Sequence, residues 1–225
     1  MNKLINLIHK SFLLGFFIRT LDYCLQKELK ECKTVLDIGC GPSSPIQRCL
    51  NIKYSVGVEP FIPYLNLSIK NKIHSKYLAK KIEELDFPKR SFDAVIMIEV
   101  IEHLPKKTAL EIMRKASLWA KKKVIISSPN GYLEQQELDN NPLQKHLSGW
   151  SYSTMMKLGY TCRGLAGLRW LRKENDDPSM GDNLMSSIKL KPKFFWFTIA
   201  TISQICTYYF PSLAFELFSV KNINS

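Results

Sequence analysis

A short run that combines acid and glycine, Asp-Ile-Gly-Cys-Gly at positions 37–41, closes an apolar stretch near the start of the chain. Glycine lets the backbone approach a ligand closely and adopt dihedral angles that other residues avoid. Glu59 closes the next apolar stretch, where a Rossmann-like fold places a carboxylate that accepts hydrogen bonds from ribose hydroxyls. These two features together predict a nucleoside-binding site.

A second group of reactive side chains follows a later apolar run, at Glu99, Glu102 and His103. An imidazole in this position could take a proton from a neutral hydroxyl or amine, so His103 is the first candidate for a general base. His146 lies in a downstream segment and is the second candidate. His74 has no partner in the sequence pattern, and we expect it on the surface.

Apolar runs at positions 34–38, 54–58, 92–98 and 124–126 predict strands, with a weaker candidate at 77–79. Because these runs are nearly continuous, the strands should be buried on both faces. Helices are expected between them, at 45–50, 63–71 and 106–120. The alternation predicts a parallel sheet with crossover helices, and Ser44 followed by Pro45 predicts a capped helix start.

The glycine run departs from the dinucleotide pattern G-x-G-x-x-G, since Ser44 stands where the third glycine would be. That glycine allows close helix packing beside a pyrophosphate. S-adenosylmethionine has no phosphate and carries a sulfonium cation, so the acidic Asp37 suits it better than it suits a pyrophosphate. S-adenosylmethionine is therefore the expected cofactor.

Three segments resemble motifs of the class I S-adenosylmethionine-dependent methyltransferases, at positions 35–41, 57–60 and 91–104. The resemblance implies an α/β, Rossmann-like seven-stranded sheet with an antiparallel last strand and helices on both faces. It implies that Asp37, Gly39 and Gly41 surround the methionine part of the cofactor and that Glu59 holds the ribose. The residues assigned to the cofactor are Asp37, Gly39, Cys40, Gly41, Glu59, Ile82, Glu83 and Glu99.

The adenine side departs from the family pattern, because Lys81 occupies the position where many relatives have an acid. The adenine amino group would then rely on backbone and on Ile82, or on Glu83 after a small register shift.

The pattern Glu99-x-x-Glu102-His103 resembles the ubiquinone-pathway O-methyltransferases, in which the corresponding loop can bind a divalent cation. Glu-His-Leu is nevertheless common in the wider family without any metal. We therefore assign no metal and retain His103 and His146 as the catalytic candidates.

The composition, 45% hydrophobic and 23% charged, excludes global disorder. The net charge of +12 fits an anionic partner or a lysine-rich solvated surface. No C-x-x-C pair occurs among the six cysteines, which favours reduced thiols and a cytoplasmic location, with attachment to the inner face of the membrane as an option. The run at 98–101 lacks the Asn/Asp-Pro-Pro-Tyr/Phe motif of DNA amino-methyltransferases, so we expect no nucleic-acid partner.

We expect an N-terminal helical cap at 1–32 and a methyltransferase domain at 33–225, with an apolar helical insertion at about 194–210 and a closing strand at 213–221. Weakly polar residues at every third position of the insertion, from Thr198 to Thr207, favour an interfacial or core-packed helix over a membrane-spanning one. Aromatic residues and nearby lysines suit an anionic membrane surface. Packing in an oligomer interface or against the sheet is the alternative.

The region after position 128 loosely resembles methyltransferases of bacterial polysaccharide and lipid-linked glycan pathways, on the segments 128–131, 146–150 and 158–160. This resemblance implies a small-molecule or glycan hydroxyl as methyl acceptor. An RNA or protein methyltransferase, and a non-catalytic scaffold of the same fold, remain the alternatives.

Overall fold

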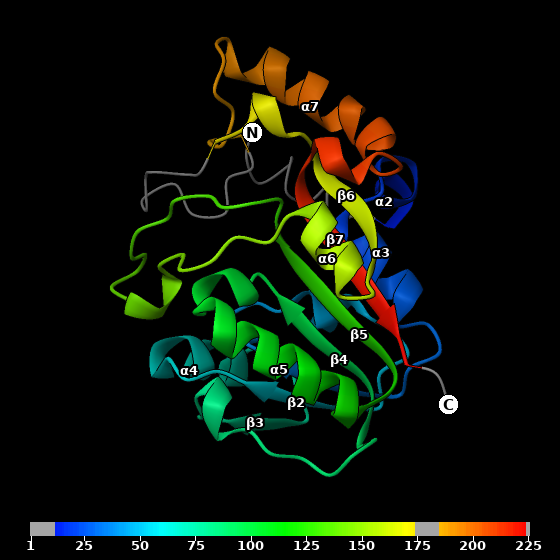
Figure 1. The fold of residues 1–225 in the computed structure, drawn as a ribbon, viewed down its shortest axis with the longest axis vertical. Coiled ribbons are helices and arrows are strands. Elements are labelled where there is room, and N and C mark those ends of the chain that lie inside the picture. The colour runs from blue at the N-terminus through cyan, green and yellow to red at the C-terminus, as the bar shows by residue number, and fades with distance from the viewer. Residues whose placement is uncertain (1–11, 174–184, 224–225) are drawn as a thin grey trace.

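The computed structural model describes residues 12–173 and 185–223, which form a seven-stranded sheet in the order β3-β2-β1-β4-β5-β7-β6 (Figure 1). Strands β1 to β5 run parallel, and β7 is antiparallel to both of its neighbours, β5 and β6. The predicted fold class is confirmed. The strands are β1 (Thr34–Ile38), β2 (Tyr54–Val58), β3 (Lys76–Leu78), β4 (Phe92–Ile98), β5 (Ala120–Pro129), β6 (Thr161–Leu168) and β7 (Ala214–Asn222).

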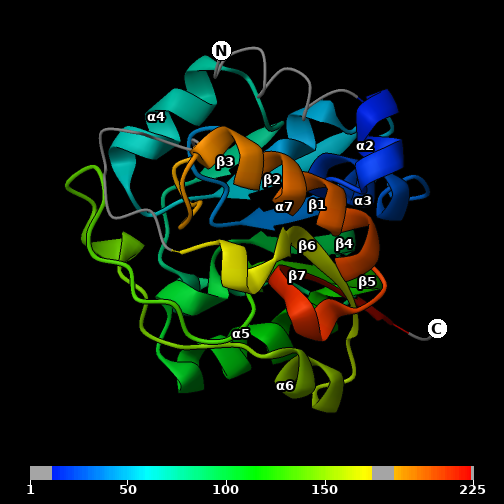
Figure 2. The same ribbon diagram turned by 90° about the horizontal axis from the view of Figure 1, so that it is seen from above.

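Helices cover both faces of this sheet (Figure 2). One core lies beneath α5 (Lys106–Trp119) and α6 (Tyr152–Lys157). The opposite core lies beneath α3 (Leu21–Glu28) and receives Tyr208, which follows α7 (Lys193–Thr207). The remaining helices are α2 (Phe12–Ile18) and α4 (Ile62–Lys70).

The central strands contribute side chains to both cores in alternation. In β1, Val35 belongs to the core under α3, and Leu36 belongs to the core under α5. In β4, Ile96 belongs to the core under α3, and Met97 belongs to the core under α5. Successive side chains of a strand point to opposite faces, so burial of both explains the continuous apolar runs.

Two elements differ from their predicted extents. The helix expected at 45–50 is a single 3₁₀ turn, Pro45–Arg48, because the chain must return to β2; Ser44 caps it by accepting a hydrogen bond from the Ile46 N–H. Strand β5 begins before the predicted position 124, at Ala120. Its start contains three lysines, one of which, Lys123, pairs with Glu28 of α3 at 2.6 Å. Their charge concealed the strand in the hydropathy pattern.

The described part of the expected N-terminal cap consists of α2 and α3, and positions 1–11 lie outside the described residues. The apolar insertion forms α7, between β6 and β7, and α2 packs beside it. None of the helices in the described ranges combines the length and hydropathy that crossing a membrane requires.

Two glycines of β6 allow the backbone of α7 to approach the sheet closely. A Cβ atom on Gly164 would lie 2.2 Å from the Thr207 carbonyl oxygen, and one on Gly167 would lie 2.1 Å from that of Ala200. Both oxygens belong to the helix backbone, which cannot yield as the end of a flexible side chain would. The helix therefore sits against β6 only because both positions lack a side chain.

Gly164→Ala should lower the free energy of unfolding by about 1–3 kcal/mol, because the added methyl group overpacks the contact between α7 and β6. Urea denaturation followed by circular dichroism measures the change. Thr198→Ala on the exposed side of the same helix is the control and should change the unfolding free energy by less than about 0.5 kcal/mol. Equal stability of the Gly164→Ala variant and the parent would contradict the packing described here.

Candidate functional site

The glycine run forms a turn that is anchored to the end of β2. The N–H groups of Gly39 and Cys40 both donate to the Val58 carbonyl oxygen, at 2.8 and 3.0 Å. Gly39 and Gly41 have φ angles of +70° and +55°, in the left-handed region that favours glycine. Cys40 is buried, and burial raises the pKa of its thiol, which therefore stays protonated.

The two glycines have different surroundings. A Cβ atom on Gly39 would lie 2.5 Å from Cγ2 of Val100, so the turn packs directly against the loop that follows β4. A Cβ atom on Gly41 would meet nothing within 4 Å. Gly41 therefore faces open space, where a ligand can approach the backbone.

Glu59 is held beside this turn by two backbone N–H groups. Its Oε2 accepts from Gly41 at 3.1 Å, and its Oε1 accepts from Phe61 at 2.9 Å. Burial raises the pKa of the carboxyl group, and these two hydrogen bonds oppose that rise. Each oxygen keeps a second lone pair, so the group can still accept from a pair of ribose hydroxyls.

Asp37 supports the turn from inside the protein. Its side chain is only 1% exposed, and Oδ2 accepts a hydrogen bond from the Ser44 hydroxyl at 2.5 Å. Burial raises its pKa to about 7. The structure thus places Asp37 beneath the turn, with its carboxyl group bonded to the residue that caps the next helical turn.

His74, expected on the surface, is instead buried beneath the same site. Its Nδ1 lies 3.3 Å from the Ser55 hydroxyl and its Nε2 lies 3.4 Å from Oδ2 of Asp37. Burial lowers its pKa to about 4, so this is no charged pair at neutral pH. Gly57 makes room for the ring, since a Cβ atom there would lie 2.4 Å from it. The burial of His74 could not be predicted from the sequence, because its partners Ser55 and Asp37 lie on the neighbouring strands β2 and β1.

The two residues assigned to adenine lie in the short 3₁₀ turn Ile82–Glu84. Ile82 is 9% exposed and packs into the core, whereas Glu83 is exposed. Both line a hollow of about 50 Å³ against α5. Their contact with adenine stays a prediction.

The loop after β4 begins with a constrained residue. Glu99 has a φ angle of +54°, a conformation that is costly for a residue with a side chain and that tends to occur at functional sites. Its N–H donates to the Ser127 carbonyl oxygen at 3.0 Å, and its Oε1 accepts from the Ser127 hydroxyl at 2.6 Å. Neighbouring β5 therefore fixes Glu99 at the carboxyl edge of the sheet.

The segment that carries His146 is bound to this loop by hydrogen bonds to two carbonyl oxygens. The N–H groups of Leu147 and Ser148 donate to Glu102 O at 2.8 and 3.0 Å. The Ser148 hydroxyl and the indole of fully buried Trp150 donate to Ile101 O at 3.0 and 3.2 Å. These bonds bring together two segments whose bonded residues are 45 to 49 positions apart in the chain.

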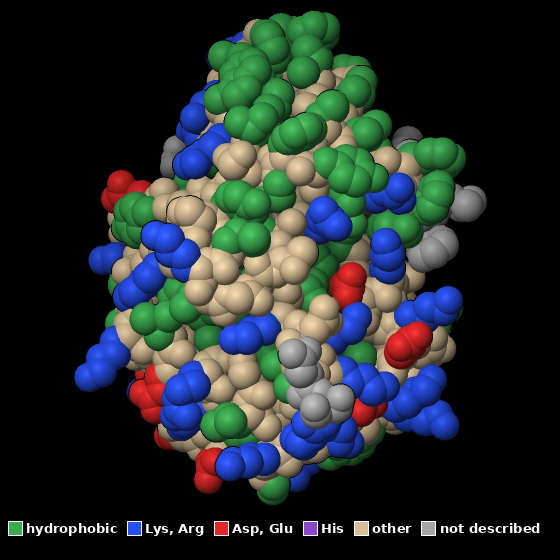
Figure 3. Space-filling model, turned by 45° about the vertical axis from the view of Figure 1, so that its right-hand side comes forward, with side chains coloured by type: hydrophobic (Ala, Val, Ile, Leu, Met, Phe, Trp, Pro, Cys, Tyr) green, Lys and Arg blue, Asp and Glu red, His purple; other side chains and the backbone are tan. Residues whose placement is uncertain are grey.

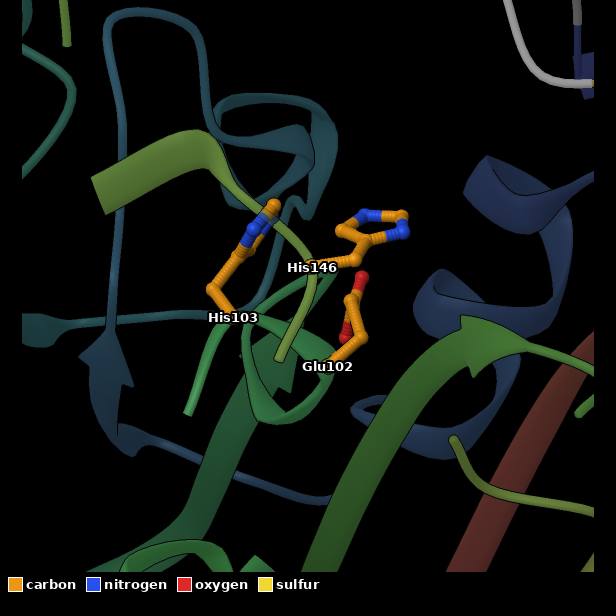
Figure 4. A group of neighbouring side chains, drawn as sticks. All are labelled: Glu102, His103 and His146. Atoms are coloured by element: carbon orange, nitrogen blue, oxygen red, sulfur yellow. The ribbon is translucent and has the colours of Figure 1, made fainter. Parts of the chain in front are cut away.

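The two candidate bases consequently lie side by side. The ring centroids of His103 and His146 are 4.8 Å apart, and the Glu102 carboxyl group points toward them (Figure 4). Nδ1 of His103 lies 3.3 Å from Lys145 O, and Nδ1 of His146 lies 2.9 Å from Leu133 O. Carbonyl oxygens only accept, so each Nδ1 carries the proton and each Nε2 keeps a lone pair.

Both imidazoles are neutral at physiological pH. Burial, and then the neighbouring His146, lower the pKa of His103 to about 4. Burial also lowers the pKa of His146. In each neutral ring Nε2 keeps the lone pair that a proton acceptor needs.

The carboxyl group of Glu102 interacts with those of Glu99 and Glu216, of which Glu216 was not predicted. Burial, followed by the charge of Glu99, raises the pKa of Glu102 well above its usual range. The same causes raise the pKa of Glu216 in β7 to about 8, against the opposing charge of Arg172. Glu216 escaped the sequence analysis because the pairing of β7 with β5 brings it here from the far end of the chain.

Three side chains at this site could offer ligands to a metal ion. Glu102, His103 and His146 each offer a ligand atom, all within 4.8 Å of one another. The group differs from the E-x-x-E-H pattern, since His146 takes the place of Glu99.

In the folded protein the His103 ring should titrate near pH 4, below the ordinary value of 6.5, because burial disfavours its charged form. The unfolded chain then takes up this proton between pH 6.5 and 4, so the group's contribution to stability falls as pH drops through that window. Histidine ring signals in ¹⁵N–¹H NMR measure the midpoint. A midpoint at or above 6.5 would show that the ring is not buried as described.

Comparison with known proteins agrees with the fold described above. Residues 36–121 match the family model described as a methyltransferase domain. A SAM-dependent methyltransferase from Archaeoglobus fulgidus is 18% identical, with a TM-score of 0.52, and the match covers 94% of this chain and 98% of that one. The PH0226 protein from Pyrococcus horikoshii OT3 is 14% identical, with a TM-score of 0.53. That match covers 92% of this chain and 89% of the PH0226 chain.

The plantazolicin methyltransferase BpumL, solved in complex with SAH, is 10% identical, with a TM-score of 0.53 over 96% of this chain and 85% of that one. No match was found among curated protein sequences. Residues 36–121 are therefore similar to the methyltransferase-domain family, and the chain has the fold of the solved methyltransferases that it resembles.

Proposed function

We propose that the protein transfers a methyl group from S-adenosylmethionine to a hydroxyl group of a small molecule or glycan. The observation that carries this proposal is the contact between Gly39 and Val100. It joins the glycine turn to the loop that bears His103, so that a cofactor site and a pair of neutral bases share one edge of the sheet.

The cofactor side of the site fits S-adenosylmethionine. Gly41 leaves open space at the turn, and Glu59 keeps free lone pairs at the end of β2. In this proposal Glu59 binds the ribose hydroxyls, and the backbone at 39–41 contacts the methionine part. Asp37 acts as a positioning residue that holds the turn from beneath. When bound, S-adenosylmethionine supplies a methyl group that its sulfonium already activates for displacement.

The acceptor side supplies the proton chemistry. A neutral hydroxyl needs a base as its oxygen attacks carbon. Nε2 of His103 or His146 takes that proton, since the two rings lie side by side and each keeps a lone pair on this atom.

All six cysteines lie in the described ranges and form no disulfide there, which supports the proposed cytoplasmic location.

Glu59→Ala should weaken binding of S-adenosylmethionine about 10- to 100-fold, because it removes hydrogen bonds to a charged acceptor. Isothermal titration calorimetry measures the dissociation constant. Glu31→Ala removes an exposed carboxylate elsewhere and should bind like the parent. Unchanged affinity in a folded Glu59→Ala variant would refute the cofactor site.

His103→Asn or His146→Asn should lower kcat about 100-fold or more in whichever variant loses the base, while cofactor affinity stays within about twofold of the parent. Radiolabelled methyl transfer to sugars, lipid-linked glycans, phenolic quinone precursors and RNA identifies the acceptor and then measures kcat. Full kcat in both variants would refute the assignment of the base. Transfer to RNA or protein alone would replace the proposed acceptor class.

A further inference from the structure

Helix α7 buries polar side chains against the sheet beside the apolar Phe197 and Ala200. Gln204 is 5% exposed, and its Oε1 accepts from the Gly167 N–H at 2.7 Å. Its Nε2 donates to Gly164 O at 3.1 Å and to Arg19 O, also at 3.1 Å. The Ser203 hydroxyl accepts from the Leu168 N–H at 3.1 Å. Gln204, which belongs to the weakly polar stripe seen in the sequence, thus links the helix to β6.

Apolar side chains cover the opposite side of this helix and of the turn that follows it. We call them the apolar face: Phe194, Phe195, Ile202, Ile205, Tyr209 and Phe210, each between 46% and 62% exposed. Phe16 and Phe17 of α2, which packs beside α7, are 47% and 66% exposed. Hydrophobic side chains gather over this end of the molecule in Figure 3.

Apolar side chains thus occupy both sides of α7, since Phe197 and Ala200 are buried on its inner side, and this differs from an ordinary surface helix. Such a helix buries its apolar stripe and exposes its polar one, because exposed apolar area is unfavourable in water. Contiguous apolar patches on a protein surface mark sites that contact another protein or a membrane. The apolar face therefore requires an apolar environment outside the chain.

The charges around the face identify that environment. No acidic residue occurs at positions 185–213 or 12–21, whereas Lys189 and Lys191 are exposed just before α7. Lysine and arginine side chains adjoin the hydrophobic area in Figure 3. A two-fold dimer would place identical lysine-bearing edges opposite each other, between copies that each carry a net charge of +12. A negatively charged surface matches them instead.

We propose that α7 and α2 dock the protein on an anionic membrane surface, with the apolar face inserted at the boundary between headgroups and acyl chains. A helix of 15 residues is about 22 Å long and can lie in that plane. Aromatic side chains are suited to the boundary, and the lysines meet anionic headgroups. This attachment is independent of the methyl-transfer chemistry.

Flotation with vesicles of phosphatidylcholine, with and without phosphatidylglycerol, tests the proposal on the intact chain. The parent should float with the anionic vesicles. The double variant Phe195→Ser/Ile202→Ser should lower the partition coefficient about 100-fold, since each side chain contributes about a factor of ten or more when buried. Lys189→Gln/Lys191→Gln should lower binding to anionic vesicles about fivefold per lysine.

Leu50→Ser is the matched control, because Leu50 is 94% exposed and lies away from α7, after the 45–48 turn. It should float like the parent. All substitutions are at exposed positions, and unchanged urea midpoints will show that each variant folds. Equal flotation of the parent and Phe195→Ser/Ile202→Ser would overturn the proposal. The proposal would also be overturned if the parent does not bind vesicles and sediments as a dimer, and if the same substitutions dissociate that dimer.

Discussion

The carbonyl oxygen of Val58 is the acceptor on which the site depends. It receives the N–H groups of Gly39 and Cys40, so the turn after β1 is fixed to the end of β2. The following residues of the two segments are bonded as well, since the Gly41 N–H donates to the Glu59 carboxylate. Because both strands end at the same edge of a parallel sheet, the glycine backbone and the carboxylate converge there.

The catalytic half is built by the same kind of interaction. Carbonyl oxygens of Ile101 and Glu102, left without sheet partners where β4 ends, accept bonds from the segment 147–150. That pairing positions His146 against His103. Since Gly39 packs on Val100, the two halves form one continuous structure, and a side chain at position 39 would force them apart.

The strands, the glycine turn and Glu59 were predictable from the sequence because each depends on local pattern and on chain order. The burial of His74 was not, since Gly57 and Ser55 of β2 and Asp37 of β1 together form its surroundings. Glu216 reaches the site only through the antiparallel pairing of β7. The orientation of α7 was also hidden, because periodicity shows that a helix has two faces and does not show which one meets the sheet.

Hydrogen–deuterium exchange of the intact chain, with and without S-adenosylmethionine, tests the central claim most directly. The account predicts slower exchange at the backbone amides of 39–41 and of the loop 99–104, with no change in α7. Exchange that is unaffected by the cofactor, or protection confined to other segments, would contradict it.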